Sequence, residues 1–586
     1  TTAATAYKLK LSGNLIVYSN GILNCATSGT NMPSDSEFDL TLDCAANVDF
    51  GITIRNNGTW NGYGHAKFTT TFKTLLTASN GGYCTTSGTA VTAVTSQAQS
   101  FTGLTGAIVI NGVGYTISSV TDATHLTLTG TAGTQSSPVR WTHAGTAVNI
   151  TVADTTGWAV GDLLCFASTS TSVAECEMPV GGIASGITGT AAVMTTDLAF
   201  PHLGTSPTQA EVGNLTRNIK IHGIGTNAPS ITTTLQGYID IKATAIVTLR
   251  HVEFYYLGSV TANKRGIDVA TTTGTFDMQY CSIRDGWITS SMGVNVSSAS
   301  GSTITFSNNV TFNLNNIHFA NGSTTGVQTV NNVLSMLNVA NTNLFSFSDV
   351  GGLYSYLSVV GCVSSAIFIG EAGGLVNLFD NIVAHSSSGG INFSTCVGTV
   401  SNLTVWRTSG GNGGIIASSP ASLVINTATL FGNSVRSIGL IGQGYAFVNC
   451  TFNNVTSNGD SIWATQMAIG LLSGGKVSGI RLVNCDFSTV SGIKTAHTSD
   501  IAISTAYSPT TITTINCKFG AATDVLTPGN MSTGSYIAMQ AHDQTDADHL
   551  TYMREGKVTL DTTAGMWRTA SPSARLTPTN ATEKLD

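Results

Sequence analysis

Acidic side chains on neighbouring repeats are the residues of this sequence whose types and spacing could support acid–base chemistry. Cleavage of a glycosidic bond needs two or three carboxylates close enough to divide the roles of acid and base. The candidates are Glu371 with Asp380, near which His385 lies in sequence, and Glu253 with Asp277 and Asp285. The alternative is that each carboxylate is a solvated turn residue, or binds the backbone of its own turn, because some neighbouring pairs arise by chance.

Three carboxylates near the C-terminus could converge on a cation, because acidic residues two to three positions apart can share one ion. They are Asp543, Asp546 and Asp548, flanked by His542 and His549. The segment lacks the glycine and the terminal glutamate of a calcium loop, so a polar connector is the alternative interpretation. The sequence has no glycine-rich phosphate loop, nucleophile elbow or zinc-ligand spacing, and we predict no cofactor.

A recurring five-residue phrase indicates which elements would position these side chains. An apolar residue, asparagine, cysteine, a polar residue and an aromatic residue follow one another in Val448–Phe452, Val483–Phe487 and Ile515–Phe519. The copies lie 35 and 32 residues apart, which is the size of one coil of a solenoid. We expect the asparagine to turn the chain, because it tolerates the left-handed conformation, and the cysteine and phenylalanine to point inward.

Composition favours an all-β protein with a buried core. Charged residues make up 9% and hydrophobic residues 41%, there are 64 glycines, and the mean hydropathy is +0.19, so the chain is not of the disordered class. Abundant Thr, Val and Ile favour strands. A formal net charge of −7 without clustered Lys and Arg predicts no nucleic-acid partner. No apolar run is long enough to predict membrane insertion.

The cysteines and the chain ends give two further expectations. None of the 11 cysteines lies in CxxC spacing, and the recurrent ones occupy inward positions, so we predict free, buried thiols. The chain begins Thr1-Thr2-Ala3 without Met and ends within a strand-like segment at Lys584-Leu585-Asp586. We therefore expect it to be part of a longer or processed product.

The strand pattern predicts four parts. Residues 1–81 and 145–235 form an N-terminal β domain with the first coils, and 82–144, whose hairpin at 107–117 has no counterpart in the coil phrase, form a small inserted β domain. Degraded copies of the phrase make 236–526 a right-handed parallel β-helix of about eleven or twelve coils. Residues 527–586, which open with Pro528-Gly529, are a connector and the start of a C-terminal β module.

Three motifs occur in the order found in eight-glycine domains that precede a right-handed β-helix. They are Trp158-Ala159-Val160-Gly161-Asp162, the Leu198–His202 segment, and Glu211-Val212 followed by Arg217-Asn218-Ile219. In these motifs the chain resembles fibrocystin-type and cell-surface hyaluronan-degrading proteins over residues 7–78 and 146–260. Those relatives carry a histidine where this chain has Lys264–Val269, so the resemblance transfers no hydrolytic role for the family's histidines.

Two other segments resemble bacteriophage virion proteins. The 82–144 insertion is similar to small β modules of tail-fibre proteins, and Met566–Pro578 resembles a phrase that leads into a β-sandwich in large virion proteins. The resemblance implies a structural and adhesive component of a phage particle, such as a tail fibre, spike or surface appendage. Its location would be the virion or the extracellular space. Its partners would be copies of itself, other virion proteins and a host-surface polysaccharide.

Two hypotheses of other classes stay open at this point. One is an enzyme, a polysaccharide depolymerase acting as a glycan hydrolase or lyase, although the sequence favours a role without catalysis. The other is a bacterial extracellular filament or surface protein. Carboxylates on adjacent coils within about 5–10 Å of one another would favour the enzyme.

Overall fold

Strands make up nearly all of the regular structure in the computed structural model of the chain. The residues described are 5–28, 30–43, 49–67, 70–76, 81–94, 100–143, 149–204, 206, 208–223, 237–259, 261, 264–286, 292–297, 301–322, 327–338, 343–348, 352–370, 376–410, 413–418, 422–433, 436–441, 450–458, 467–473, 480–487, 501–502, 511–519, 526–527, 536–542, 559–561 and 566–568. Within them the chain forms a parallel β-solenoid of about 14 turns, which confirms the all-β class and the solenoid. No helix of the described residues is long and apolar enough to cross a membrane.

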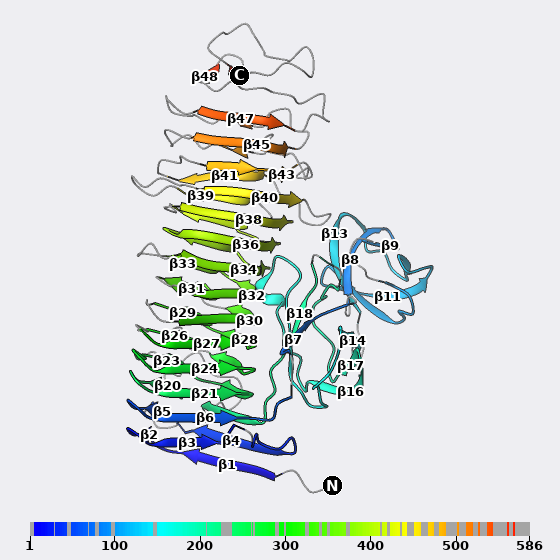
Figure 1. Ribbon diagram of the computed structural model, residues 1–586. Coiled ribbons are helices and arrows are strands. Elements are labelled where there is room, and N and C mark those ends of the chain that lie inside the picture. The colour runs from blue at the N-terminus through cyan, green and yellow to red at the C-terminus, as the bar shows by residue number, and fades with distance from the viewer. Residues whose placement is uncertain are drawn as a thin grey trace. The chain divides into compact units, whose positions relative to one another are not determined.

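Two compact units make up the chain, residues 1–344 with 358–363, and residues 345–357 with 364–586. In the first unit the solenoid begins at the N-terminus (Figure 1). The first two coils are β1 (Thr5–Leu11), β2 (Leu15–Val17) and β3 (Ile22–Cys25), then β4 (Ser36–Leu42), β5 (Gly51–Ile54) and β6 (Thr59–Tyr63). The third is β19 (Ile219–Gly223), β20 (Tyr238–Ile241) and β21 (Ile246–Arg250). Because Leu40 of β4 lies opposite both Leu9 and Ile221, the third coil continues the stack directly after a long insertion.

The later coils of the first unit repeat the same three strands in parallel register. They are β22 (Val252–Tyr255), β23 (Ile267–Val269), β24 (Thr275–Gln279), β25 (Ser282–Gly286), β26 (Val294–Val296), β27 (Thr303–Ser307), β28 (Val310–Leu314), β29 (Phe319–Asn321) and β30 (Val327–Asn338). Alternation directs every second side chain inward, where equivalent residues stack. One such inward row is Leu249, Met278, Phe306 and Val330, all fully buried.

Residues in the left-handed conformation mark one corner of these coils. They are His251, Tyr280, Asn308 and Asn332, with φ of 52°, 56°, 55° and 52°. The His251 and Tyr280 rings stack with centroids 5.0 Å apart, and Asn332 Nδ2 donates to Asn308 Oδ1 at 2.6 Å. Side chains at this corner therefore interact with the equivalent side chains of the next coil, by ring stacking or by a hydrogen bond.

The insertion, residues 64–218, contains a closed six-stranded barrel and two small antiparallel sheets. The barrel strands are β8 (Gly81–Ser87), β9 (Ala90–Ala93), β10 (Ala107–Ile110), β11 (Val113–Val120), β12 (His125–Leu128) and β13 (Thr134–His143). One sheet has β14 (Asn149–Thr151), β16 (Ile183–Thr188) and β17 (Ala191–Met194); the other has β7 (Phe72–Thr74), β15 (Leu164–Phe166) and β18 (Glu211–Asn214). A single helical turn, η2 (Val173–Glu175), lies between them in sequence. The two ends of the insertion meet, since the backbone N–H of His65 donates to Asn218 Oδ1 at 2.8 Å.

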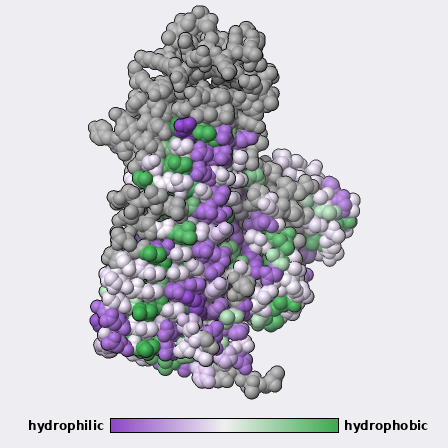
Figure 2. Space-filling model, viewed as in Figure 1, coloured by the Kyte–Doolittle hydropathy of each residue, from purple (hydrophilic) through white to green (hydrophobic). Residues whose placement is uncertain are grey.

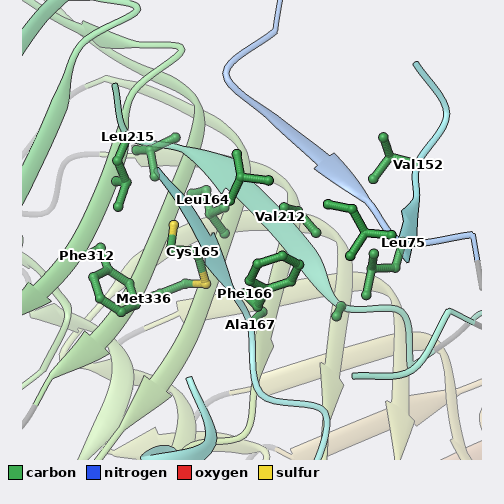
Figure 3. Close-up of a cluster of buried hydrophobic side chains, with 14 of the residues drawn as sticks. Leu75, Val152, Leu164, Cys165, Phe166, Ala167, Val212, Leu215, Phe312 and Met336 are labelled. Carbon is green, nitrogen blue, oxygen red and sulfur yellow. The ribbon is translucent and has the colours of Figure 1, made fainter. Parts of the chain in front are cut away.

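The insertion packs on the outside of the coils that follow it. Figure 3 shows Phe312 and Met336 of the solenoid facing Cys165 and Phe166 of the insertion, in one buried hydrophobic cluster. Phe312 and Met336 belong to an outward row that begins with more polar side chains. In register this row is Thr41, His222, Tyr255, Arg284, Phe312 and Met336. The row turns apolar where the insertion removes it from water.

The second unit has the same kind of repeat, with several strands of nine or ten residues. Its strands, with β32 (Leu353–Cys362) divided between the units, are β31 (Phe345–Ser348), β33 (Ser365–Gly370), β34 (Val376–His385), β35 (Gly389–Ser394), β36 (Val397–Trp406), β37 (Ile415–Ser418), β38 (Ser422–Phe431), β39 (Arg436–Ile441), β40 (Cys450–Asn458), β41 (Met467–Ser473), β42 (Ile480–Val483), β43 (Asp486–Phe487), β44 (Ile501–Ala502), β45 (Thr511–Phe519), β46 (Leu526–Thr527), β47 (Tyr536–His542), β48 (Thr559–Asp561) and β49 (Met566–Arg568). Except for the antiparallel β48–β49 hairpin, these strands pair in parallel with the equivalent strand of the next coil.

The recurring phrase is partly in the predicted register. Asn484 has φ of 52° and Phe452 and Phe487 are fully buried, which confirms the bend and the inward positions. Asp486 lies opposite Lys518, so the second and third copies are equivalent. The first copy is not, because Cys450 lies opposite Ile480 and not opposite Cys485. The residue equivalent to Asn484 is instead Asn454, which has φ of 53°.

The cysteines whose side chains the structure describes are buried free thiols in both units, as predicted.

A buried histidine lies inside the first unit. His318 is fully buried, and its Nδ1 lies 2.8 Å from Thr311 Oγ1 and 2.7 Å from Ser335 Oγ. Burial lowers the pKa of His318 to about 3. The imidazole is therefore neutral in the folded chain at neutral pH.

We predict that Phe452→Asp or Phe487→Asp disrupts the solenoid, because each places an unpaired charge between coils. The expected loss is on the order of 3–5 kcal/mol of unfolding free energy, measured by calorimetric or circular-dichroism melting. Thr451→Asp, on the opposite face of the same strand, is the matched control and should melt near the wild type. Wild-type melting of both phenylalanine variants would show that the two side chains do not need to be buried.

We further predict that acid destabilises the chain through His318. The unfolded imidazole takes a proton near pH 6.5, whereas the folded one does so only near pH 3. The stability that neutral His318 contributes is thus complete above about pH 6.5 and is lost as the pH falls from there towards 3. Urea unfolding at about pH 5 should show a loss of about 2 kcal/mol from this group relative to neutral pH.

His318→Gln should flatten this pH dependence, whatever its effect at neutral pH, because glutamine does not titrate. His125→Gln removes a half-exposed histidine of the barrel and serves as the control. Equal pH slopes for His318→Gln and the wild type would contradict the assignment.

Candidate functional site

The predicted carboxylates Glu253 and Asp277 do not face each other. Glu253 lies opposite Ser282, and Asp277 lies opposite Thr248, so the corner at His251 falls between them along the coil. Glu253 is buried. Its Oε1 accepts from Arg284 Nη2 at 2.7 Å, and its Oε2 accepts from the backbone N–H of Arg217 at 3.1 Å.

The remaining predicted residues are either engaged with neighbours or outside the described chain. Asp277 pairs with Arg250 and accepts from Gln279 Nε2 at 2.8 Å. Asp380 accepts from Asn381 and Asn402, each at 2.7 Å. Both asparagines have φ of 53°, so they occupy left-handed corners of the second unit. Glu371, Asp543, Asp546 and Asp548 lie outside the described residues. Among the residues that the structure does describe, no group of three or more His, Cys, Asp or Glu could hold a metal ion.

A different carboxylate pair lies on adjacent coils of the first unit. Asp240 of β20 is directly opposite Asp268 of β23, and neighbouring strands are about 4.8 Å apart. Ile239 and Ile241 flank Asp240 and are fully buried, so alternation directs both aspartates to the outer face of the coil. This strand spacing is close to the carboxyl separation of a retaining glycosidase, and both side chains are largely buried, with 9% of Asp240 and 2% of Asp268 exposed.

The two aspartates have different partners. Asp268 accepts from the backbone N–H of Arg265 at 2.7 Å and from Asn295 Nδ2 at 2.8 Å. Burial, opposed by these two hydrogen bonds and assisted by the charge of Asp240, raises the pKa of Asp268. Asp240 Oδ2 instead lies 2.7 Å from Lys242 Nζ, and its Oδ1 is buried without a hydrogen-bond partner in the described part of the chain. The two carboxylates therefore lie in different environments, one hydrogen-bonded and the other paired with a lysine.

Lys242 also belongs to a surface depression formed by the turns of the first three coils. Val17, Ile54 and Ile241 are in register, so the residues that follow them, Tyr18, Arg55 and Lys242, come one above the other. The depression is open to solvent and has a volume of about 430 Å³; it is lined by Tyr18, Ser19, Arg55, Asn56 and Lys242. Tyr18 is 66% exposed.

The turns that carry the depression are tied together. Arg55 N–H donates to Val17 O, and Lys242 N–H donates to Ile54 O, both at 2.9 Å. Beside them, the Thr244 hydroxyl donates to Asn57 Oδ1 at 2.7 Å and accepts from the Asn57 N–H at 2.8 Å. Asn57 itself has φ of 59°, in the left-handed region. The backbone of the turns that carry the depression is therefore fixed from coil to coil by hydrogen bonds.

Sequence reasoning missed both the aspartate pair and the depression. The signal for the pair was present in the repeated triplets Ile239-Asp240-Ile241, Ile267-Asp268-Val269 and Val294-Asn295-Val296, which place one polar residue outward on three successive coils. The row of Tyr18, Arg55 and Lys242 had no comparable signal, because each follows a strand of different composition.

Comparisons with known proteins give only remote likenesses. No family model and no curated protein matches the chain. The chain is similar in structure to the Gp54 tailspike of Acinetobacter baumannii bacteriophage AP22 in complex with A. baumannii capsular saccharide, with 10% identity, 91% of this chain and 73% of that chain covered, and a TM-score of 0.27. The chain is also similar to the catalytic unit of the GH87 α-1,3-glucanase from Streptomyces thermodiastaticus, with 11% identity, 79% of this chain and 88% of that chain covered, and a TM-score of 0.26. A third similar structure is the tailspike gp49 of Pseudomonas phage LKA1, with 10% identity, 80% of this chain and 74% of that chain covered, and a TM-score of 0.22.

Likenesses of this size carry no argument about function, which must come from the chain's own residues. The resemblance to eight-glycine domains stays a prediction, since no family model matches.

Proposed function

We propose that the chain is a structural, glycan-binding component of a bacteriophage particle, such as a tail fibre, spike or surface appendage. The observation that carries the glycan-binding role is the exposed Tyr18 beside Ser19, Arg55, Asn56 and Lys242 in one depression. An exposed aromatic ring offers an apolar face to a sugar ring, and the surrounding amide, hydroxyl and cationic groups match its polar substituents.

The solenoid supports this proposal as a scaffold. Equivalent side chains recur at the spacing of the strands, about 4.8 Å, so a linear polymer can contact several coils with one pattern of groups. Hydrophilic side chains gather over the stacked strands, with scattered apolar residues beside them (Figure 2). The placement in a virion rests on the sequence resemblance of 82–144 and 566–578 to phage proteins, and includes assembly with further copies or other virion proteins.

This proposal predicts that the purified chain binds host-surface polysaccharide and that Tyr18→Ala weakens binding. Loss of the exposed ring should reduce affinity about five- to tenfold, measured by calorimetry or biolayer interferometry across a panel of bacterial capsular polysaccharides. Tyr7→Ala, which removes a tyrosine of the first coil that is 58% exposed, is the control. The proposal fails if the wild type binds no member of a panel that includes the host's own polysaccharide.

A second candidate function, polysaccharide depolymerase, is favoured by the Asp240–Asp268 pair. Asp268, whose pKa burial raises, would protonate the departing glycosidic oxygen. Asp240, held by Lys242, would attack the sugar carbon or activate a water molecule. The candidates named from sequence, Glu253, Asp277, Asp380 and Glu371, stay alternatives for these roles.

For this second function, Asp268→Asn and Asp240→Asn should each lower the release of reducing ends from a bound polysaccharide at least about a hundredfold. Asp268→Asn should leave polysaccharide affinity nearly unchanged, whereas Asp240→Asn also frees the charge of Lys242 in the depression. Asp277→Asn tests the other predicted pair in the same assay. Loss of activity in Asp277→Asn together with full activity in Asp240→Asn would move the chemistry to that pair. A wild type without any cleavage would exclude catalysis on the polymer tested.

A further inference from the structure

The charges around the depression do not cancel. Lys242 Nζ is paired with Asp240 Oδ2 at 2.7 Å, so its charge is balanced within the site. Arg55 is exposed, lines the depression, and has no ion pair or side-chain hydrogen bond among the described residues. The depression thus presents one uncompensated guanidinium on a chain whose formal net charge is −7.

A guanidinium of this kind binds oxyanions in bidentate pairs. Its N–H groups form a rigid fork that matches the two oxygens of a carboxylate in a bidentate pair. A single net positive charge balances a carboxylate, whereas a doubly charged phosphate would remain undercompensated and would face the Asp240 carboxylate two residues before Lys242. The charge of the site therefore fits a monoanion better than a dianion.

We propose that this depression binds an acidic saccharide, a uronic-acid residue of a polymer, with its carboxylate on Arg55 and its ring against Tyr18. Asn56 and Ser19 supply the donors and acceptors for the remaining hydroxyls. Because Tyr18, Arg55 and Lys242 stand on three successive coils, the ring and the carboxylate of one sugar meet groups about one strand spacing apart. The inference rests on the proposed glycan-binding function and names the class of glycan.

The test compares an oligogalacturonate with its methyl ester, in which each carboxylate is replaced by an uncharged ester. We expect the wild type to bind the acid at least about tenfold more tightly than the ester, with an affinity that falls as NaCl is raised. Arg55→Gln should weaken binding of the acid about tenfold or more and binding of the ester by a clearly smaller factor, so that the preference for the acid is lost. Arg481→Gln removes the same charge at an exposed position of the second unit and should change neither.

The outcomes separate this inference from the function on which it rests. Equal binding of acid and ester by the wild type, or an Arg55→Gln variant that binds the acid as the wild type does, overturns the assignment of Arg55 and leaves glycan binding intact. Absence of binding both to these oligomers and to the host polysaccharide panel overturns the proposed function, and the inference with it. Melting curves of Arg55→Gln and Arg481→Gln that match the wild type establish that any loss of affinity is local.

Discussion

Parallel, in-register stacking is the constraint on which the rest of this structure depends. Each coil must present an apolar side chain at every inward position that its neighbours fill, as in the row of Leu249, Met278 and Phe306. Once inward positions are in register, outward positions are in register as well. The stacking of Asp240 on Asp268, and of the residues after β2, β5 and β20, is thus a consequence of packing the interior. Groups far apart in sequence become neighbours at the fixed distance between strands.

The same register explains how the insertion is held. The outward row that contains His222 and Tyr255 turns apolar at Phe312 and Met336, where Cys165 and Phe166 cover it. Burial of apolar surface stabilises by roughly 25 cal/mol per Å², so exchanging outward polar residues for apolar ones converts a solvated face into a binding face. The covered face of the solenoid therefore differs from its solvent-exposed faces in the side chains of an outward row, while the backbone of the coils stays the same.

Sequence patterns predicted the features that lie within one coil and missed the contacts that form between two coils. Alternation and recurrence were enough for the all-β solenoid, for the bend at Asn484 and for the burial of Phe452 and Phe487. The phrase at Cys450 was placed in the wrong register, because the same letters can occur on either side of a corner and coil lengths differ. The partner of Glu253 is Arg284 on the following coil, and such a partner is visible only when the register is known. The aspartate pair was missed for the same reason, although Asp268 lies in Lys264–Val269, where proteins with eight-glycine domains carry a histidine.

The contact between the two ends of the insertion has a consequence for how such a chain can diversify. His65 and Asn218 are joined by a hydrogen bond, and β4 continues directly onto β19, so the host fold is complete without the intervening residues. Closing a long loop costs little more than closing a short one, because the entropic cost grows only with the logarithm of its length. The junction is therefore a position at which the solenoid accommodates an inserted domain. Recombination could exchange the module carried there, provided that the replacement covers the apolar row at Phe312 and Met336.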